Sequence, residues 1–387
     1  MRIAQVVPIM MTLPPKKYGG IERDVAELAT ELGKRGHEVT VFAAKGSKLD
    51  SLGVKIIESS PFPTDKDRSQ NRKWEINQAL QVLSLQNNFD IIHFHYEPII
   101  FRYIIDKSDF NLLEYFTTPF LVSFHNQTYI EKHIEYYKSH KNLWKIPYTF
   151  VSRSHRKPLS FLPHTSIVYN GIPIETFEFN NNPKDYLFFL GRITPEKGIV
   201  EAIQVAKLSG KKLIIAAKVD AVDKEYYEKK VKPLIDEKQI VYIGEVEHKQ
   251  KVKLLRNALC LLFPIQWNEP FGIVMVEAMA CGTPVIAFAR GSVPEVIKDG
   301  ETGYIVNTTS EMVDAISKIN TINRQQCRKW VEKLFNAKSM IDKYEAIYIS
   351  RINNQVVISR TKPPQVKFCA PSPSPVRGLK CSRKPDF

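Results

Sequence analysis

The sequence has no apolar run that approaches the ~18 residues needed to cross a bilayer. Its first stretch, Met1 to Leu13, is apolar enough to be mistaken for a signal peptide. However, Gln5 and Pro8 interrupt it, and no small-residue cleavage site follows. We therefore expect a first buried strand here, and no membrane-spanning helix in the chain.

Cysteine is scarce and scattered. The five cysteines form an odd set without a Cys-x-x-Cys pair: Cys260, Cys281, Cys327, Cys369 and Cys381. Cys260 and Cys281 lie in apolar contexts, where a free thiol packs as a small hydrophobe. This pattern argues against a zinc site and favours a reducing, cytoplasmic location.

Other metal-site patterns are equally weak. Asp65-Lys66-Asp67 has the form of an Asp-x-Asp metal motif, but it lies in a Pro-rich polar stretch instead of at the end of an apolar strand, so we interpret it as a solvated loop. His93 and His95 lie near Glu97 at the end of a predicted strand, and no third ligand recurs at a metal-site spacing. We predict no bound metal.

Acidic residues are too few to balance the basic ones. The 387 residues include 55 Lys and Arg against 41 Asp and Glu, a formal charge of +14. The segment from Arg360 to Phe387 holds seven basic residues and one acid, which leaves +8 for the rest. A basic body fits nucleoside diphosphates, acidic lipid headgroups or nucleic acid. No recognised nucleic-acid motif accompanies the charge, so we do not expect nucleic acid as the partner.

The length suits two domains, and an alternation of strands and helices starts twice. The first alternation fills residues 1–170 and opens with a strand, a helix and a strand; the second fills 171–340 and opens with Tyr186 to Leu190. Asn170 to Pro173, between them, suits a hinge. A last helix is expected within 341–359. Residues 360–387 are basic and Pro-rich and cannot support a core, so we expect disorder there. The fold class is α/β.

Two loops after predicted strands carry candidate ligand contacts. Gly19-Gly20 follows the first strand and begins a helix, where a doubly wound fold brings backbone close to a ligand. A lone Gly-Gly is otherwise a simple turn. His125 follows the apolar run Phe120 to Phe124, so it should point into the crevice and can bind a sugar hydroxyl.

The stretch from Trp267 to Ile286 carries the most chemical information. Pro270 suits a first helical position and Gly272 permits close approach of a ligand, which predicts Glu269 at the helix mouth and Glu277 roughly two turns inside. The free N–H groups of residues 271–274 form an anion site. Carboxylates beside a phosphate site suit sugar hydroxyls, so the chemistry suggests a nucleotide sugar. The alternative is an amphipathic helix with one solvated glutamate.

These residues resemble a known signature. Glu269 and Glu277, with Pro270-Phe271-Gly272 between them and Gly282-Thr283-Pro284-Val285 after them, look like the motif of glycosyltransferase family 4 (glycosyl transferases group 1), retaining enzymes of the GT-B fold. Gly191 to Gly198 is similar to the family's Gly-Arg…Glu-Lys-Gly motif, and Tyr18-Gly19-Gly20 to its donor loop. The resemblance covers residues 1 to about 350. It implies two Rossmann-like domains facing a central cleft, with the last helix crossing back to the first domain.

The resemblance also implies a role for each matching residue. Arg192 and Lys197 would hold the leaving phosphates, a role that also suits their charges. Glu269 would hold sugar hydroxyls, Glu277 the ribose, and His125 the sugar or the acceptor. The predicted catalytic set is His125, Arg192, Lys197 and Glu269. The other predicted donor contacts are Gly19, Gly20, Gly244, Glu245, Phe271, Gly272, Ile273 and Val274. Loops around Lys16, Tyr18, His95 and Tyr129 are assigned to the acceptor side.

The expected reaction moves a hexosyl unit from a nucleoside-diphosphate sugar to an acceptor hydroxyl with retention. No enzymic nucleophile is evident, in agreement with the front-face mechanism usually proposed for the family, in which the leaving phosphate takes the acceptor's proton. The nucleotide sugar would be a co-substrate, and no cofactor is expected. Family frequency favours UDP. The sugar, the nucleobase, the acceptor, the oligomeric state and the role of the tail stay open.

Two other classes compete with this interpretation. A nucleotide-sugar epimerase can share the fold, but such enzymes lack the loop that runs here from Arg192 to Lys197. A non-catalytic protein could use its basic body and tail to bind a membrane. The stretch Tyr129 to Lys145, rich in aromatic and basic residues, either meets an anionic membrane surface or forms a solvated helix beside the acceptor site. The first alternative would place the protein peripherally at the inner membrane face.

Overall fold

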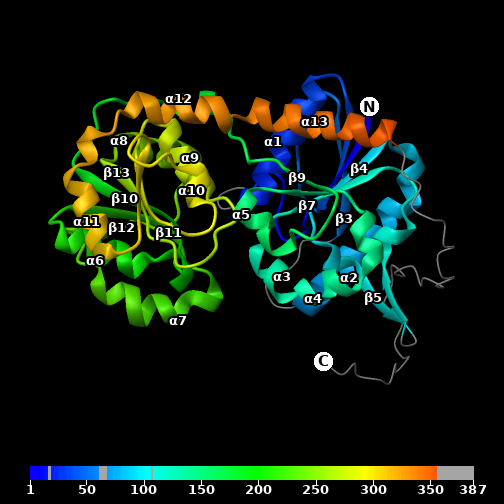
Figure 1. Cartoon of the computed structure of the whole chain (residues 1–387), viewed down its shortest axis with the longest axis horizontal. Coiled ribbons are helices and arrows are strands. Elements are labelled where there is room, and N and C mark those ends of the chain that lie inside the picture. The colour runs from blue at the N-terminus through cyan, green and yellow to red at the C-terminus, as the bar shows by residue number, and fades with distance from the viewer. Residues whose placement is uncertain (16–18, 61–67, 106–107, 355–387) are drawn as a thin grey trace.

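The structure is a computed structural model that describes residues 1–15, 19–60, 68–105 and 108–354. Lys16, Tyr18, the Asp65-Lys66-Asp67 motif and the tail from residue 360 lie outside the described residues. The described chain forms two α/β lobes side by side, each built on a parallel sheet, as Figure 1 shows. The predicted fold class is therefore confirmed.

The first lobe contains a seven-stranded parallel sheet with the order β3-β2-β1-β4-β7-β8-β9. Its strands are β1 (Arg2–Val6), β2 (Glu38–Ala44), β3 (Val54–Ser60), β4 (Ile91–Phe94), β7 (Phe120–Phe124), β8 (Tyr148–Phe150) and β9 (Thr165–Ile167). The helices are α1 (Gly20–Lys34), α2 (Arg68–Leu85), α3 (Gln127–Lys132), α4 (Ile134–Ser139) and α5 (Arg153–Arg156), and a hairpin joins β5 (Arg102–Ile105) to β6 (Ser108–Asn111). The strand order reverses between β1 and β4, and a doubly wound sheet binds ligands at such a point.

The second lobe repeats this plan with six parallel strands in the order β12-β11-β10-β13-β14-β15. Its strands are β10 (Tyr186–Arg192), β11 (Lys212–Lys218), β12 (Ile240–Tyr242), β13 (Cys260–Phe263), β14 (Val285–Phe288) and β15 (Gly303–Val306). The helices are α6 (Ile199–Leu208), α7 (Lys224–Tyr226), α8 (His248–Asn257), α9 (Ile273–Ala280), α10 (Val293–Val296), α11 (Thr309–Ser317) and α12 (Arg324–Leu334). Here the order reverses between β10 and β13.

The central strands are buried along their whole length because helices cover both faces of each sheet. Every residue of β4, β7, β13 and β14 is buried. This burial explains why these strands appear in the sequence as short continuous apolar runs instead of alternating patterns. The helix α1 is amphipathic, and Val25, Leu28 and Leu32 pack into the core with the strand residue Ile3.

The chain passes between the lobes at two points that lie side by side. The N–H of Ile172 donates to the carbonyl of Phe335 over 3.0 Å, and the N–H of Ala337 donates to the carbonyl of Ile172 over 2.9 Å. A Cβ at Gly171 would lie 2.5 Å from the carbonyl oxygen of Asn336, so this close approach of two backbones requires glycine. The predicted hinge segment thus contacts the second crossing directly.

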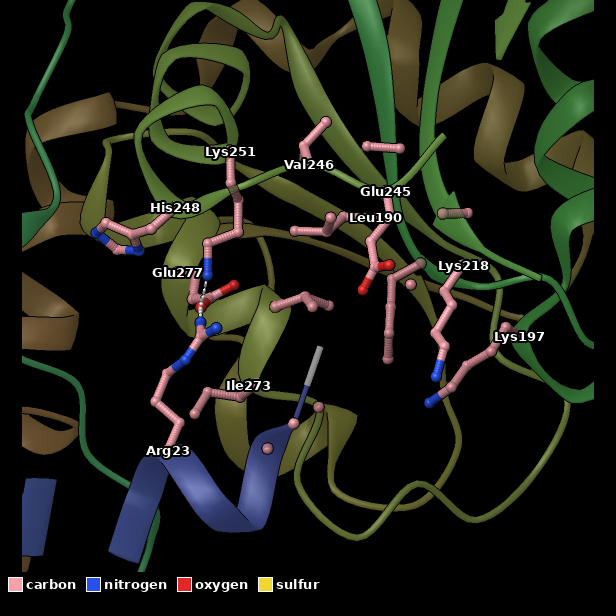
Figure 2. Close-up of a pocket in the computed structure, with 18 of the residues that line it drawn as sticks. Arg23, Leu190, Lys197, Lys218, Glu245, Val246, His248, Lys251, Ile273 and Glu277 are labelled. Atoms are coloured by element: carbon pink, nitrogen blue, oxygen red, sulfur yellow. Dashed lines mark hydrogen bonds and ion pairs between the residues drawn. The ribbon is translucent and has the colours of Figure 1, made fainter. Parts of the chain in front are cut away.

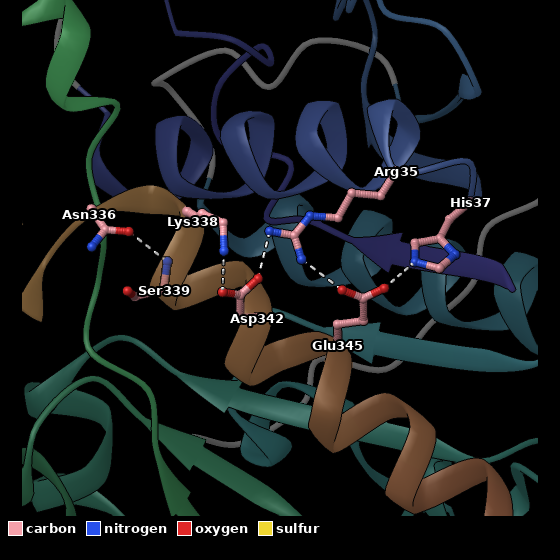
Figure 3. A network of polar contacts seen from close by, with 7 residues as sticks. All are labelled: Arg35, His37, Asn336, Lys338, Ser339, Asp342 and Glu345. Atoms are coloured by element: carbon pink, nitrogen blue, oxygen red, sulfur yellow. Dashed lines mark hydrogen bonds and ion pairs between the residues drawn. The ribbon is translucent and has the colours of Figure 1, made fainter.

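After the second crossing, α13 (Ala337–Asn353) packs on the first lobe, while α12 lies on the second (Figure 1). Figure 3 shows its polar attachment to the turn between α1 and β2: Glu345 accepts from Arg35 over 2.7 Å and contacts His37 over 2.7 Å. Asp342 adds an ion pair with Arg35 at 2.8 Å. On its inner side, Tyr344 and Tyr348 are buried with the first-lobe core.

The sequence suggested a helix for the stretch from residue 129 to 145, but the structure divides this stretch among three elements. It contains the end of α3, the separate α4 and a 3₁₀ turn, Lys141–Lys145. Tyr136 and Tyr137 are buried, so part of the aromatic content serves the core instead of a surface. Among the helices that the structure describes, none is both long and apolar enough to span a membrane.

Candidate active site

A cavity lies where the start of α1 meets the carboxyl ends of the second-lobe strands, and Figure 2 shows the side chains around it. It adjoins the place where the second sheet reverses its strand order, as expected for a doubly wound fold. Residues from both lobes line it: Gly19, Gly20, Arg23, Leu190, Gly191, Lys197, Ala216, Ala217, Lys218, Glu245, Val246, His248, Lys251, Phe263, Glu269, Gly272, Ile273, Val274 and Glu277.

The helix behind this cavity begins later than predicted. The expectation that Pro270 occupies the first helical position is wrong, because α9 starts at Ile273 and is preceded by Gly272 in the left-handed conformation at φ 71°. A left-handed residue is accessible to glycine at little cost, and it redirects the chain into the helix. Glu277 is therefore the fifth helical residue, little more than one turn inside instead of two.

Glu269 forms the centre of one polar group in the cavity wall. Its Oε2 lies 2.5 Å from Lys197 Nζ and accepts from Trp267 Nε1 over 2.8 Å. Lys197 ends a 3₁₀ turn, Pro195–Lys197, and Gly198 follows in the left-handed conformation. The Lys197 and Glu269 side chains are only 13% and 11% exposed, so the pair is largely shielded from bulk water. Two opposite charges are thus fixed at one end of the cavity.

Glu277 forms the centre of a second group, which joins the two lobes. Its Oε1 makes a short ion pair with Lys251 Nζ from α8 and lies 3.5 Å from a guanidinium nitrogen of Arg23 on α1. Figure 2 shows the two cations approaching the carboxylate from opposite sides. Desolvation lowers the pKa of Lys251 from its ordinary value, and the Glu277 charge acts against that shift. No motif in the sequence singles out Lys251 or Arg23 as a site residue.

The sequence suggested that Arg192 lies on a loop, but in the structure it belongs to a strand. It is the last residue of β10, and its guanidinium contacts Glu196 at 3.1 Å and Asp220 at 3.5 Å. Among the described residues that line the cavity, Lys218 is present and Arg192 is not. Lys218 pairs in register with Arg192 at the end of β11 and contacts Asp220 at 2.7 Å. A lysine at the carboxyl end of an apolar strand was the signal that could have identified it.

His125 follows β7 in the first lobe and lies outside the cavity lining. Its Nε2 is 3.2 Å from His95 Nδ1, and burial lowers the pKa of His125 to about 4. The backbone N–H groups of His125 and Asn126 donate to Glu97 over 3.3 and 2.8 Å. Burial raises the pKa of the Glu97 carboxyl to about 7. The imidazole of His125 is therefore neutral near pH 7.

Two residues assigned to the acceptor side have different surroundings. The His95 side chain is only 3% exposed and contacts His125, so it packs in the interior, and the assignment of its loop to the acceptor side stays a prediction. Tyr129 is 39% exposed, and its ring stacks on His133 at a centroid distance of 6.0 Å.

Two of the predicted donor contacts also lie elsewhere. The Phe271 side chain is 3% exposed and packs between Tyr169 and Phe335 in the core, and Phe271 is not among the residues that line the cavity. Gly244 turns the chain at φ 74° outside the lining, and its carbonyl accepts from the N–H of Ala217. The other described donor-site residues, Arg192 apart, do line it. Val246 and His248 are further lining residues that the sequence did not reveal.

Within the part of the chain that the structure describes, no group of three or more His, Cys, Asp or Glu side chains could hold a metal ion.

The two-lobed arrangement matches solved structures of one class. A sucrose-phosphate synthase from Thermosynechococcus elongatus aligns over 90% of this chain and 98% of its own, with a TM-score of 0.74 and 18% identity. HepE from Anabaena, solved in complex with UDP-glucose, aligns over 90% of this chain and 100% of its own, with a TM-score of 0.66 and 16% identity. The fold is that of the GT-B glycosyltransferases.

The sequence places the chain more narrowly. The family described as Glycosyltransferase Family 4 matches residues 18–175, and the family described as Glycosyl transferases group 1 matches residues 174–336. A phosphatidyl-myo-inositol mannosyltransferase of Mycolicibacterium smegmatis is 25% identical over 350 residues, 85% of this chain and 86% of that protein. An uncharacterized protein of the Klebsiella pneumoniae cps region is 32% identical over 204 residues, 48% of this chain and about half of that protein (54%). The protein belongs to the group 1 glycosyltransferases of family 4 and is an enzyme, a glycosyltransferase.

Proposed function

We propose that this glycosyltransferase takes a nucleoside-diphosphate sugar as its donor, a UDP-sugar by preference, and transfers a hexosyl unit to a hydroxyl with retention. The observation that carries the proposal is the composition of the cavity. It combines a helix N-terminus and two lysines, which suit a diphosphate, with two buried carboxylates, which suit hydroxyl groups. The complex of HepE with UDP-glucose supports the choice of UDP.

The diphosphate would lie at the first turn of α9. Ile273 and Val274 line the cavity there, and the first N–H groups of a helix have no acceptor within the helix. Lys197, from the turn that follows β10, and Lys218, at the end of β11, would supply positive charge from the same lobe. Lys218 lines the cavity whereas Arg192, which pairs with Glu196 at 3.1 Å, does not, so in this proposal Lys218 takes the second cationic position.

The two glutamates would bind the hydroxyls at either side of the diphosphate. Lys251 and Arg23 both approach Oε1 of Glu277, and Oε2 is the oxygen proposed to accept from the ribose. In the same way, Lys197 and Trp267 both approach Oε2 of Glu269, and Oε1 is proposed to accept from the sugar. Each cation orients its carboxylate without using both of its oxygens.

Catalysis would rest on stabilising the leaving diphosphate. Fixed positive charges and helix N–H groups act on the charge that develops as the bond to the sugar breaks, and removing one comparable donor costs about 2.7 to 4 kcal/mol in other enzymes. The leaving phosphate would take the proton of the acceptor hydroxyl, and neutral His125 would hold the sugar or the acceptor. This proposal needs no cofactor beyond the donor. The acceptor is a hydroxyl compound whose class the site does not define.

The donor can be identified with a panel of UDP-, GDP- and ADP-sugars, followed by thermal shift and by mass-detected donor hydrolysis. We expect stabilisation and hydrolysis with one nucleotide class. Lys218→Ala should weaken nucleoside-diphosphate binding by about tenfold or more, because a hydrogen bond to a charged group contributes about 1.5 to 3 kcal/mol. Arg192→Ala is the matched control and should change binding much less.

Unchanged donor binding and hydrolysis in both Lys197→Ala and Glu277→Ala would contradict the site assignment. NMR of the donor incubated without acceptor distinguishes the epimerase alternative, since only an epimerase would convert it into another sugar nucleotide.

A further inference from the structure

A chain of buried hydrogen bonds connects His125 to the last helix. His125 Nε2 lies 3.2 Å from His95 Nδ1, and His95 Nε2 lies 2.8 Å from Gln5 Oε1. The Gln5 amide nitrogen then donates to the Tyr348 hydroxyl over 3.0 Å. Gln5 belongs to β1 and Tyr348 to α13, and both are fully buried. This series of hydrogen bonds therefore runs from helix α13 through the centre of the first sheet to His125.

The chemistry of each atom in this chain fixes where the protons lie. An amide oxygen can only accept, so the Nε2 of His95 that faces Gln5 must carry a hydrogen. Burial lowers the pKa of His95 well below its ordinary value, so its ring is neutral and its Nδ1 carries a lone pair. His125 must then donate from Nε2 to that lone pair. Because His125 is also neutral, its Nδ1 is left as an acceptor.

The other end of this series of hydrogen bonds satisfies the Gln5 amide in this orientation. The Tyr348 hydroxyl accepts from Gln5 and is 2.7 Å from His93 Nδ1, to which it can donate. His93 Nε2 then donates to Ser123 Oγ over 2.6 Å. Rotating the Gln5 amide by half a turn would reverse every donor and acceptor in the chain. The orientation of the Gln5 amide therefore determines which nitrogen of His125 carries the hydrogen.

We propose that Gln5 and Tyr348 are positioning residues that hold His125 in the tautomer with a hydrogen on Nε2 and a lone pair on Nδ1. The consequence for catalysis rests on the proposed function, in which His125 contacts the sugar or the acceptor. A lone pair on Nδ1 accepts a hydrogen bond from a hydroxyl, whereas the other tautomer would only donate from that atom. The last helix, although distant in sequence, thereby sets which hydrogen bond His125 can make.

The first experiment leaves Gln5, His95 and Tyr348 unchanged. Protein labelled with ¹⁵N-histidine reports the protonation of each ring nitrogen by NMR, and His125→Asn identifies the His125 signals by their loss. We expect a hydrogen on Nε2 and none on Nδ1 in the wild-type protein at neutral pH. A hydrogen on Nδ1 would overturn the proposal.

The second experiment removes one hydroxyl from α13. Tyr348→Phe keeps the ring but releases the Gln5 amide, so both tautomers of His125 should appear. Equal populations would lower kcat by about twofold, with KM for the donor unchanged. Tyr344→Phe is the matched control: its hydroxyl is on the same helix but lies 3.4 Å from Ser123 Oγ, beyond His93, whereas the Tyr348 hydroxyl contacts Gln5 directly. It should leave one tautomer.

A single tautomer in Tyr348→Phe, with melting unchanged, would show that Tyr348 does not position His125. The NMR measurement uses no substrate, so it separates this proposal from the proposed function. If the tautomer is as expected but His125→Asn retains full turnover, Gln5 and Tyr348 do position His125, and the proposed role of His125 in transfer is wrong.

Discussion

Removing the ammonium of Lys251 should destabilise the second lobe measurably. The Lys251 and Glu277 side chains are 9% and 4% exposed, so Lys251→Met leaves a carboxylate in a poorly solvated position. Removing one partner of a buried pair costs about 3 to 5 kcal/mol. We expect about 3 kcal/mol, the lower end of that range, because Arg23 still lies 3.5 Å from the carboxylate.

A double-mutant cycle isolates the interaction. The four proteins are the wild type, Lys251→Met, Glu277→Gln and the double variant, each unfolded in urea and followed by the fluorescence of Trp267 and Trp330, which pack on the second-lobe core. The double variant should recover part of the loss, with a coupling energy of about 2 kcal/mol. Additive effects of the two single substitutions would refute the reasoning, because they would show that Lys251 does not compensate the charge of Glu277.

Two further predictions concern stability. Burial raises the pKa of Glu97 from 4.5 to about 7, so the folded protein holds a proton that the unfolded chain has released. The free energy of unfolding should therefore fall as pH rises between these values, by up to about 3 kcal/mol. Glu97→Gln should make the free energy of unfolding, measured by urea titration across that pH range, depend less on pH. The same pH dependence in both proteins would contradict the assignment. A Cβ at Gly198, where φ is 72°, would lie 1.9 Å from the carbonyl oxygen of Pro264, whereas Gly210, at φ 66°, has open space. Gly210→Ala should lower the stability by about 1 to 2 kcal/mol because of its backbone conformation alone. Gly198→Ala should cost about 1 to 3 kcal/mol more because of the steric clash, as measured by thermal melting. Equal losses of stability in the two variants would exclude the steric contribution.

Much of the fold was predictable because its signals are local. The apolar run from Phe120 to Phe124 is strand β7, and the run from Tyr186 to Leu190 forms most of β10. Apolar runs bounded by glycine, proline or charge predict buried strands well when helices cover both faces of the sheet. Local pattern failed at the start of α9, since Pro270 suits a helix as well as the turn before one, and only the left-handed Gly272 decides between them.

The polar partners in the site could not be predicted in the same way. Lys251 is one basic residue among several on an amphipathic helix, and only packing shows that it faces Glu277. Arg192 matched a motif, yet its guanidinium pairs with Glu196 outside the cavity lining, while Lys218 lines the cavity. Ion pairing between distant segments depends on which side chains the folded backbone brings within a few ångströms, and no spacing in the sequence encodes that distance.

Sequence pattern was enough to predict the two α/β lobes, the shared site of Glu269 and Glu277, and the family, because motif spacing and hydrophobic runs are properties of short segments. The tertiary structure alone decided that Arg23 of the first lobe meets Glu277 of the second, and that Tyr348 of the last helix reaches Gln5 of the first strand. Both contacts join residues far apart in the chain. Glu277, Gln5 and Tyr348 are buried, and a buried polar group needs a hydrogen-bond partner within the protein.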